Sequence, residues 1–108
     1  MPYSPAPLAQ PPAREALEQL RGPTLVEFGA PWCGHCQRAQ PLIEQALQGR
    51  DAVRHIKVHD GPGQRLGRGF GVKLWPTLVF LRDGRETARL VRPQTAREIE
   101  QALDGITP

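Results

Sequence analysis

Residues 25–36 read LVEFGAPWCGHC, and this stretch holds both cysteines of the chain. A short run of β-favouring apolar residues comes before Pro31 and a helical pattern begins at Cys33, so the cysteines stand where a strand passes into a helix. Cys33 and Cys36 lie on one face of that helix, close enough to form a disulfide. The free amide groups and the positive dipole end of the helix N-terminus stabilise a thiolate at Cys33. We therefore expect Cys33 to have a pKa below that of a free thiol.

The asymmetry between the two thiols predicts thiol–disulfide exchange. Cys33 is the nucleophile that attacks a substrate disulfide, and Cys36, one turn further along and more buried, resolves the resulting mixed disulfide. Gly34 keeps the turn uncrowded. His35 can carry a positive charge beside Cys33, which favours the thiolate and raises the reduction potential. The reverse steps donate a disulfide, so the residues leave the net direction open.

Helical and strand patterns alternate along the rest of the chain, which predicts a single α/β domain. The first two strands are separated by a helix and should be parallel, whereas Asp83-Gly84 is a hairpin signal and predicts an antiparallel pair. Thr95 and Glu98 form a capping box at the start of the last helix. The expected elements are helices at 13–20, 33–47, 64–69 and 95–104, and strands at 24–28, 53–58, 77–81 and 85–91.

Residues 13–105 resemble a thioredoxin-fold domain, and LVEFGAPWCGHC is especially similar to the catalytic domains of protein disulfide isomerase. Thioredoxin itself has proline where this chain has His35. The resemblance implies a mixed sheet of four to five strands with helices on both faces, and it divides the chain into a proline-rich arm, 1–12, and a thioredoxin-like domain, 13–108. Three further motifs match the family in the right order: Pro41 as the helix kink, Trp75-Pro76-Thr77 as the cis-proline segment, and Asp83-Gly84 as the hairpin turn.

The resemblance also implies roles for residues outside the dithiol. Pro76 would be cis and face the cysteines, excluding metal from them and exposing the Trp75 backbone to an extended substrate segment. Glu27 stands where the family has a buried acid that takes the proton of Cys36; the alternative is an edge or surface residue. The Trp75 indole either forms an apolar wall for substrate or packs beside Trp32. The residues expected to contact substrate are Trp32, Gly34, Trp75, Pro76, Thr77 and Arg92.

One departure from the thioredoxin pattern lies next to this site. Where thioredoxin has a glycine after the last strand, this chain reads Arg92-Pro93. The change alters the shape and charge beside the substrate groove, and it bears on recognition by a standard thioredoxin reductase.

Composition excludes several classes of protein. The 108 residues make one domain, and the two cysteines, three positions apart, cannot staple a disulfide scaffold. No window approaches the roughly 18 apolar residues of a membrane span. The net charge of +3 comes from arginines spread along the whole chain, whereas a nucleic-acid binder concentrates its charge and adds stacking aromatics. We expect neither a membrane nor a nucleic-acid partner.

The first twelve residues are rich in proline, which predicts an extended, disordered tail. A short edge strand around Tyr3 is the alternative. Because this segment has neither a basic start nor an apolar run, we expect no secretory signal and a cytoplasmic location. The prolines are Pro2, Pro5, Pro7, Pro11 and Pro12.

Two other functions were weighed against catalysis. Structural zinc usually takes two CxxC-type pairs, but only one pair exists, and His55 and His59 are interpreted as surface or strand-end residues, so we expect no metal site. A non-catalytic interaction module would keep the fold for binding, but an intact dithiol with its acid argues against it. We therefore expect a monomeric oxidoreductase that acts on protein or low-molecular-weight disulfides. Its electrons would come from a reductase or glutathione, and it would need no cofactor beyond the Cys33–Cys36 disulfide.

Overall fold

The computed structural model describes residues 2–108, which form a four-stranded mixed sheet with the order β2-β1-β3-β4. Strand β1 (Pro23–Gly29) lies inside the sheet, parallel to β2 (Arg54–His59) and antiparallel to β3 (Thr77–Arg82). Strand β4 (Arg85–Val91) completes the sheet by pairing with β3. The predicted parallel pair and hairpin are both confirmed.

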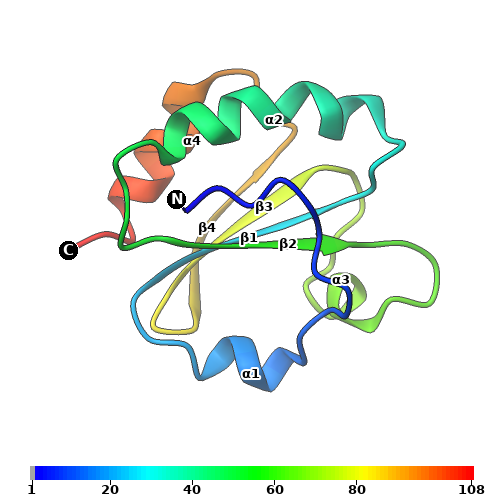
Figure 1. The fold of residues 1–108 in the computed structure, drawn as a ribbon. Coiled ribbons are helices and arrows are strands. Elements are labelled where there is room, and N and C mark those ends of the chain that lie inside the picture. Colours follow the sequence, from blue (N-terminus) through cyan, green and yellow to red (C-terminus); the bar gives the residue numbers. More distant parts are fainter. Residues whose placement is uncertain (1) are drawn as a thin grey trace.

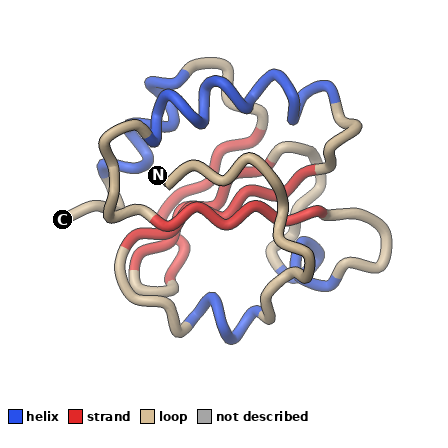
Figure 2. The backbone as a smooth tube through the Cα atoms, viewed as in Figure 1, coloured by secondary structure: helices blue, strands red, loops and turns tan. Residues whose placement is uncertain are grey.

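Helices cover both faces of this sheet (Figures 1 and 2). Helices α2 (Gly34–Leu47) and α4 (Ala96–Asp104) lie on one face, and α1 (Arg14–Glu18) and α3 (Arg65–Gly69) lie on the other. The capping box predicted at Thr95 is present. The architecture is the thioredoxin fold that the family resemblance implied, with four strands.

Each face of the sheet has its own apolar cluster. Strands β1 and β3 contribute alternate residues to the two clusters, as the twofold side-chain period of a strand requires. Under α2 and α4 the cluster includes Leu25, Ile43, Leu47, Phe80, Ile99 and Leu103; under α1 and α3 it includes Leu17, Val26, Phe28, Leu66, Phe70 and Val79. Because β1 is buried along its whole length, its C-terminal end holds the following residues in a rigid frame.

The prediction of a disordered N-terminal tail is wrong. Residues 2–12 form no strand, but they run along β2 (Figure 1), where the Leu8 amide donates to the Lys57 carbonyl at 3.0 Å. Tyr3 packs against the cluster under α2. The backbone of the arm bends at residues 5–6 and 9–10, and contacts of the residues between the prolines anchor it.

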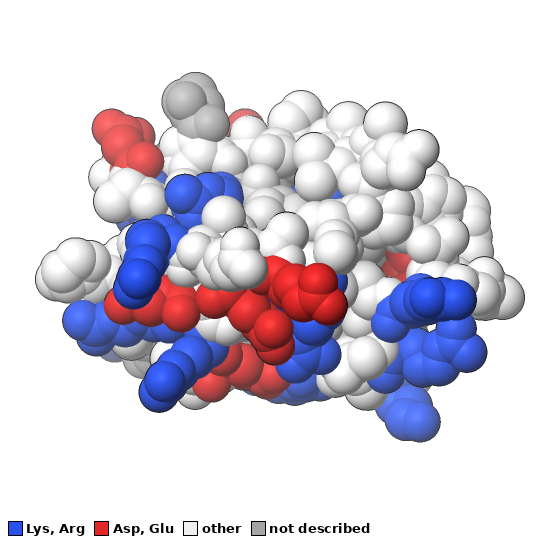
Figure 3. All heavy atoms as spheres, turned by 90° about the horizontal axis from the view of Figure 1, so that it is seen from below, with Lys and Arg blue, Asp and Glu red and all other residues white. Residues whose placement is uncertain are grey.

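The surface carries charges of both signs. On the face that bears α1, acidic side chains lie between groups of basic ones (Figure 3), and close pairs such as Arg89–Glu86 neutralise each other locally. Among residues 2–108, no helix combines the length and the apolar character needed to cross a membrane.

Candidate active site

The dithiol stands at the junction between β1 and α2, as predicted. Cys33 is the N-cap residue of α2, with an extended backbone, and its own amide donates to the Ala30 carbonyl at 3.1 Å. Both cysteines are free thiols; Cys33 is half-buried and Cys36 is buried. This arrangement leaves the Cys33 sulfur within reach of a substrate, and the Cys36 sulfur lies behind it.

The surroundings of Cys33 favour its thiolate. Partial desolvation opposes ionisation, but the backbone amide and the thiol of Cys36, the backbone amide of His35 and the charge of Arg92 together hold the pKa of Cys33 below its ordinary value. The expected lowering at a helix N-terminus is confirmed. Cys33 is therefore the better nucleophile of the pair near neutral pH.

Cys36 has the opposite environment. Burial raises the pKa of Cys36 to about 12, and the nearby Cys33 and Glu27 add to the effect against a hydrogen bond from the Ala30 amide. Gly29 makes this packing feasible, because a Cβ at position 29 would lie 2.7 Å from the Cys36 sulfur. Cys36 is thus protonated at neutral pH and needs a base before it can attack.

Glu27 lies where it can serve Cys36. Its side chain is fully buried in the inner strand β1, which excludes the alternative of an edge or surface residue. Its carboxylate accepts from Gln40 Nε2 at 2.8 Å and lies 2.9 Å from His55 Nε2. Glu27 and Cys36 both line a hollow of about 210 Å³, which exceeds the roughly 30 Å³ that one water occupies. The hollow is therefore large enough for a water molecule to carry the proton of Cys36 to the carboxylate.

His35 does not supply the positive charge expected of it. Desolvation and the charges of Arg92 and Arg38 lower the pKa of His35, and its Nδ1 lies 2.9 Å from Arg38 Nη2. An arginine can only donate, so Nδ1 accepts and the ring is neutral at pH 7. The cation that favours the Cys33 thiolate is Arg92. A role of His35 in tuning the potential stays a prediction.

The expected substrate-contacting residues divide into exposed and buried ones. Trp32 is 68% exposed and meets Trp75 edge-on, with ring centroids 5.4 Å apart, so the two indoles do pack together. The Trp75 indole also donates to Asp60 at 3.0 Å. Thr77 is buried and its hydroxyl donates to the Leu74 carbonyl at 2.6 Å. The Thr77 side chain therefore braces the loop, and a contact between Thr77 and substrate stays a prediction. Gly34 is exposed at the start of α2.

The backbone next to the dithiol is partly occupied by the chain itself. The Trp75–Pro76 peptide bond is cis. Arg92 has a left-handed backbone (φ 52°), which glycine adopts more readily. Its amide donates to the Pro76 carbonyl at 3.0 Å and its Nε donates to the Trp75 carbonyl at 2.8 Å. A substrate strand that pairs with that carbonyl must displace the Arg92 side chain.

An Arg92→Gly variant should have a higher pKa at Cys33 than the wild type, because the nearby positive charge is gone. The rise is expected to be small, since the guanidinium is exposed and its charge is screened by solvent. The rate of iodoacetamide alkylation would be measured against pH, and its rise should move to higher pH. Arg92→Lys is the control that keeps the charge; coincident curves for wild type and Arg92→Gly would rule out this electrostatic role.

Two residues beside Glu27 were missed by sequence reasoning. His55 was interpreted as a surface or strand-end residue, but its side chain is buried beside Glu27, and Gln40 reaches the same carboxylate from α2. The available signal was the carboxylate itself, since a buried acid needs hydrogen-bond donors. His59 is exposed. Over the described residues, no three His, Cys, Asp or Glu side chains form a group that could hold a metal ion.

Comparison with known proteins agrees with this geometry. Residues 8–105 match the thioredoxin family model. The chain is 60% identical to thioredoxin 2 of Pseudomonas aeruginosa PAO1, solved in its reduced form, with 92% of each chain covered and a TM-score of 0.81. Thioredoxin 1 of Synechococcus elongatus is 31% identical over 76% of this chain and 78% of that protein.

Protein disulfide isomerases match over a shorter region. Protein disulfide-isomerase erp38 of Neurospora crassa is 48% identical over 67 residues, which are 58% of this chain and 18% of that protein. The chain spans less than a fifth of the length of the isomerases that it matches. From the family match and the dithiol geometry together, the chain belongs to the thioredoxin family and carries the active site of a thiol–disulfide oxidoreductase.

Proposed function

We propose that this protein is a cytoplasmic reductase of protein disulfides. The observation that carries the proposal is the division between its two thiols: Cys33 is half-buried with a lowered pKa, and Cys36 is buried with a pKa of about 12. In a dithiol of this kind, the accessible Cys33 attacks the substrate disulfide. The buried Cys36 then attacks the mixed disulfide and forms the Cys33–Cys36 bond. Each cycle converts a substrate disulfide to two thiols and leaves Cys33–Cys36 oxidised.

The substrate is a disulfide in an accessible, extended segment. The exposed Trp32 offers an apolar contact beside Cys33. The Trp75 backbone offers hydrogen bonds to a strand once the Arg92 side chain has left the Trp75 carbonyl. Protein disulfides and small disulfides can both meet these demands. The protein acts as a monomer without a cofactor, and glutathione or a reductase returns it to the dithiol.

Stabilising the Cys33 thiolate stabilises the reduced form, which raises the reduction potential. The resemblance of the WCGHC motif to the isomerases also favours a higher reduction potential. In a reducing compartment, however, even a relatively oxidising couple stays mostly reduced and donates electrons. Potential and compartment therefore act in opposite directions, and the proposal of a reductase rests on the compartment.

The proposal is tested by the reduction potential of the Cys33–Cys36 couple, equilibrated with glutathione at pH 7. We expect a value between about −270 and about −180 mV, the range from thioredoxin to protein disulfide isomerase. A value near the lower end points to a dedicated reductase as donor, and one about 60 mV higher points to glutathione, since that step is about a hundredfold in equilibrium constant. A potential near about −120 mV, as in a dedicated oxidant, would contradict the proposal.

A further inference from the structure

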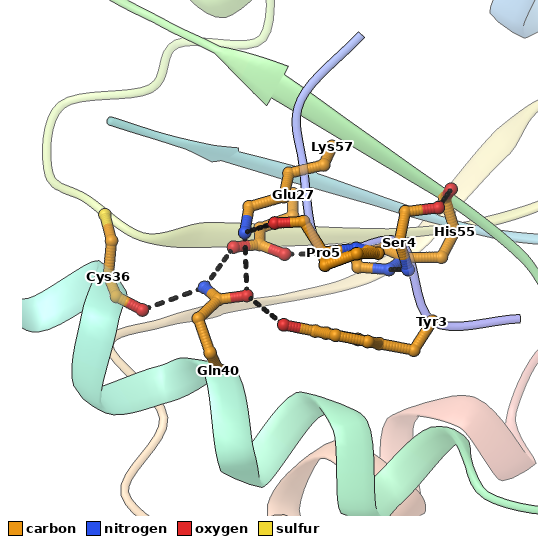
Figure 4. A network of polar contacts seen from close by, with 8 residues as sticks. All are labelled: Tyr3, Ser4, Pro5, Glu27, Cys36, Gln40, His55 and Lys57. Carbon is orange, nitrogen blue, oxygen red and sulfur yellow. Dashed lines mark hydrogen bonds and ion pairs between the residues drawn. The ribbon is translucent and has the colours of Figure 1, made fainter. Parts of the chain in front are cut away.

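The N-terminal arm is linked to the buried acid through His55. The Ser4 amide donates to His55 Nδ1 at 2.8 Å, and His55 Nε2 lies 2.9 Å from Glu27 Oε1 (Figure 4). The side chains of His55 and Glu27 are 0% and 1% exposed. Three segments far apart in sequence thus form one line of hydrogen bonds: the arm, β2 and β1.

The Ser4 amide determines where the proton of His55 lies. A backbone N–H can only donate, so Nδ1 must present its lone pair and the ring proton must be on Nε2. His55 therefore donates to Glu27 as a neutral ring. An imidazolium would place an Nδ1–H against the Ser4 N–H, and the hydrogen bond would be lost.

The arm also orients Gln40. The Tyr3 hydroxyl and Lys57 Nζ each lie 2.8 Å from Gln40 Oε1. Because the ammonium only donates, this atom is the amide oxygen, and Nε2 then donates to Glu27 and to the Cys36 carbonyl, both at 2.8 Å. Burial raises the pKa of Tyr3, with Glu27 and Glu44 adding to the effect, so its hydroxyl remains a donor.

We propose that the N-terminal arm is a positioning element of the redox site, in which Ser4 and Tyr3 hold His55 and Gln40 as the two donors to Glu27. Two donors to a carboxylate favour its ionised form. The arm thereby holds both donors on the carboxylate that would accept the proton of Cys36. The inference rests on the proposed function through that one step, the proton transfer from Cys36 to Glu27.

The surroundings of His55 make its protonation sensitive to the arm. The Tyr3 ring stacks on it with centroids 5.5 Å apart, so the arm covers it as well as binding Nδ1. Without the Ser4 amide, no backbone N–H opposes a second ring proton on Nδ1. The titratable and charged groups around it are Glu27 on β1, Tyr3 on the arm, Glu44 on α2, Asp51 before β2, and Arg54 and Lys57 on β2.

A single substitution separates the amide from the rest of the arm. Ser4→Pro removes the N–H that binds His55, whereas Ser4→Ala keeps it and removes only the hydroxyl, which donates to the His55 carbonyl at 3.1 Å. At about pH 6 an imidazole with ordinary proton affinity is mostly charged. We expect 15N NMR of the His55 ring at that pH to show a neutral Nε2–H form in the wild type and Ser4→Ala, and a doubly protonated ring in Ser4→Pro. A neutral Nε2–H ring in all three proteins overturns the proposal.

The rate at which Cys36 resolves a preformed mixed disulfide gives the functional readout. A charged His55 paired with Glu27 makes the carboxylate a weaker base, so resolution by Ser4→Pro at about pH 6 should be slower than by Ser4→Ala, by about threefold or more. At about pH 8, well above the ordinary pKa of an imidazole, the two variants should agree. Equal slowing at both pH values would indicate a merely structural effect and overturn the proposal.

This pair of measurements also separates the inference from the proposed function. If the protein is not a disulfide reductase, wild-type turnover fails while the NMR signature of His55 is still present. If only the arm lacks the inferred role, wild-type turnover persists and the NMR signatures of Ser4→Pro and Ser4→Ala coincide.

Discussion

A Cys33→Ser variant is expected to lose at least about 10³-fold in disulfide reduction, the scale on which enzymes lose a covalent nucleophile. The serine hydroxyl is not ionised near neutral pH, so nothing at this position attacks a sulfur. Cys36 cannot replace it, because it is buried and burial raises its pKa to about 12. The measurement is catalysed reduction of insulin disulfides in the presence of dithiothreitol.

The loss cannot be attributed to unfolding, since Cys33 is half-buried at the helix N-cap, outside both apolar clusters. A matched control is Gln37→Ala in the same turn, which removes only a hydrogen bond to the Pro31 carbonyl and should retain most of the activity. Turnover that survives in Cys33→Ser would contradict the mechanism. If partner binding and cellular function survive while reduction is lost, the interaction-module alternative gains support.

Much of the fold could be predicted because its signals are local. The LVEFGAPWCGHC stretch, the hairpin turn at Asp83-Gly84 and the capping box at Thr95 each require only neighbouring residues. The end of an element is less local. We expected the second strand at 53–58, but β2 is Arg54–His59, since the Val53 amide is used in a turn to the Arg50 carbonyl at 3.0 Å.

The surroundings of Glu27 could not be predicted, because they depend on strand register. Glu27 pairs with Lys57 across the parallel ladder, and Leu25 pairs with His55. Side chains two residues apart share a face, so this register brings His55 diagonally beside Glu27. A proline-dense segment likewise predicts only an extended backbone. Its docking depends on Tyr3 and Ser4 meeting partners 37 and 51 positions away.

The neutral state of His35 also depends on the charge of a residue distant in the sequence. From the sequence, a histidine between two cysteines suggests a cation next to a thiolate. Desolvation lowers the pKa of His35, and two arginines add to the effect: Arg92, which directly follows β4, and Arg38 in the next turn of α2. The positive charge is therefore present at the site, but a residue distant in sequence carries it.

A Cys36→Ser variant is expected to accumulate mixed disulfides with its substrates. Cys33 still attacks, but serine cannot resolve the intermediate, so each turnover stops at a covalent complex. Non-reducing electrophoresis after incubation with an oxidised protein substrate should show a one-to-one complex, and dithiothreitol should separate it by reducing the disulfide. The double variant Cys33→Ser/Cys36→Ser should show none, which assigns the bond to Cys33.

The mixed-disulfide intermediate also tests whether Glu27 is the base that takes the proton of Cys36. Burial raises the pKa of Cys36, so its thiolate is scarce at pH 7 and resolution without a base would be slow. Glu27→Gln, with both cysteines intact, should therefore show the same complex transiently, at a level between those of wild type and Cys36→Ser. If Cys36→Ser traps nothing while Cys33→Ser is inactive, a thiol from another molecule resolves the intermediate. If Cys36→Ser traps and Glu27→Gln resolves at the wild-type rate, water alone accepts the proton and Glu27 is structural.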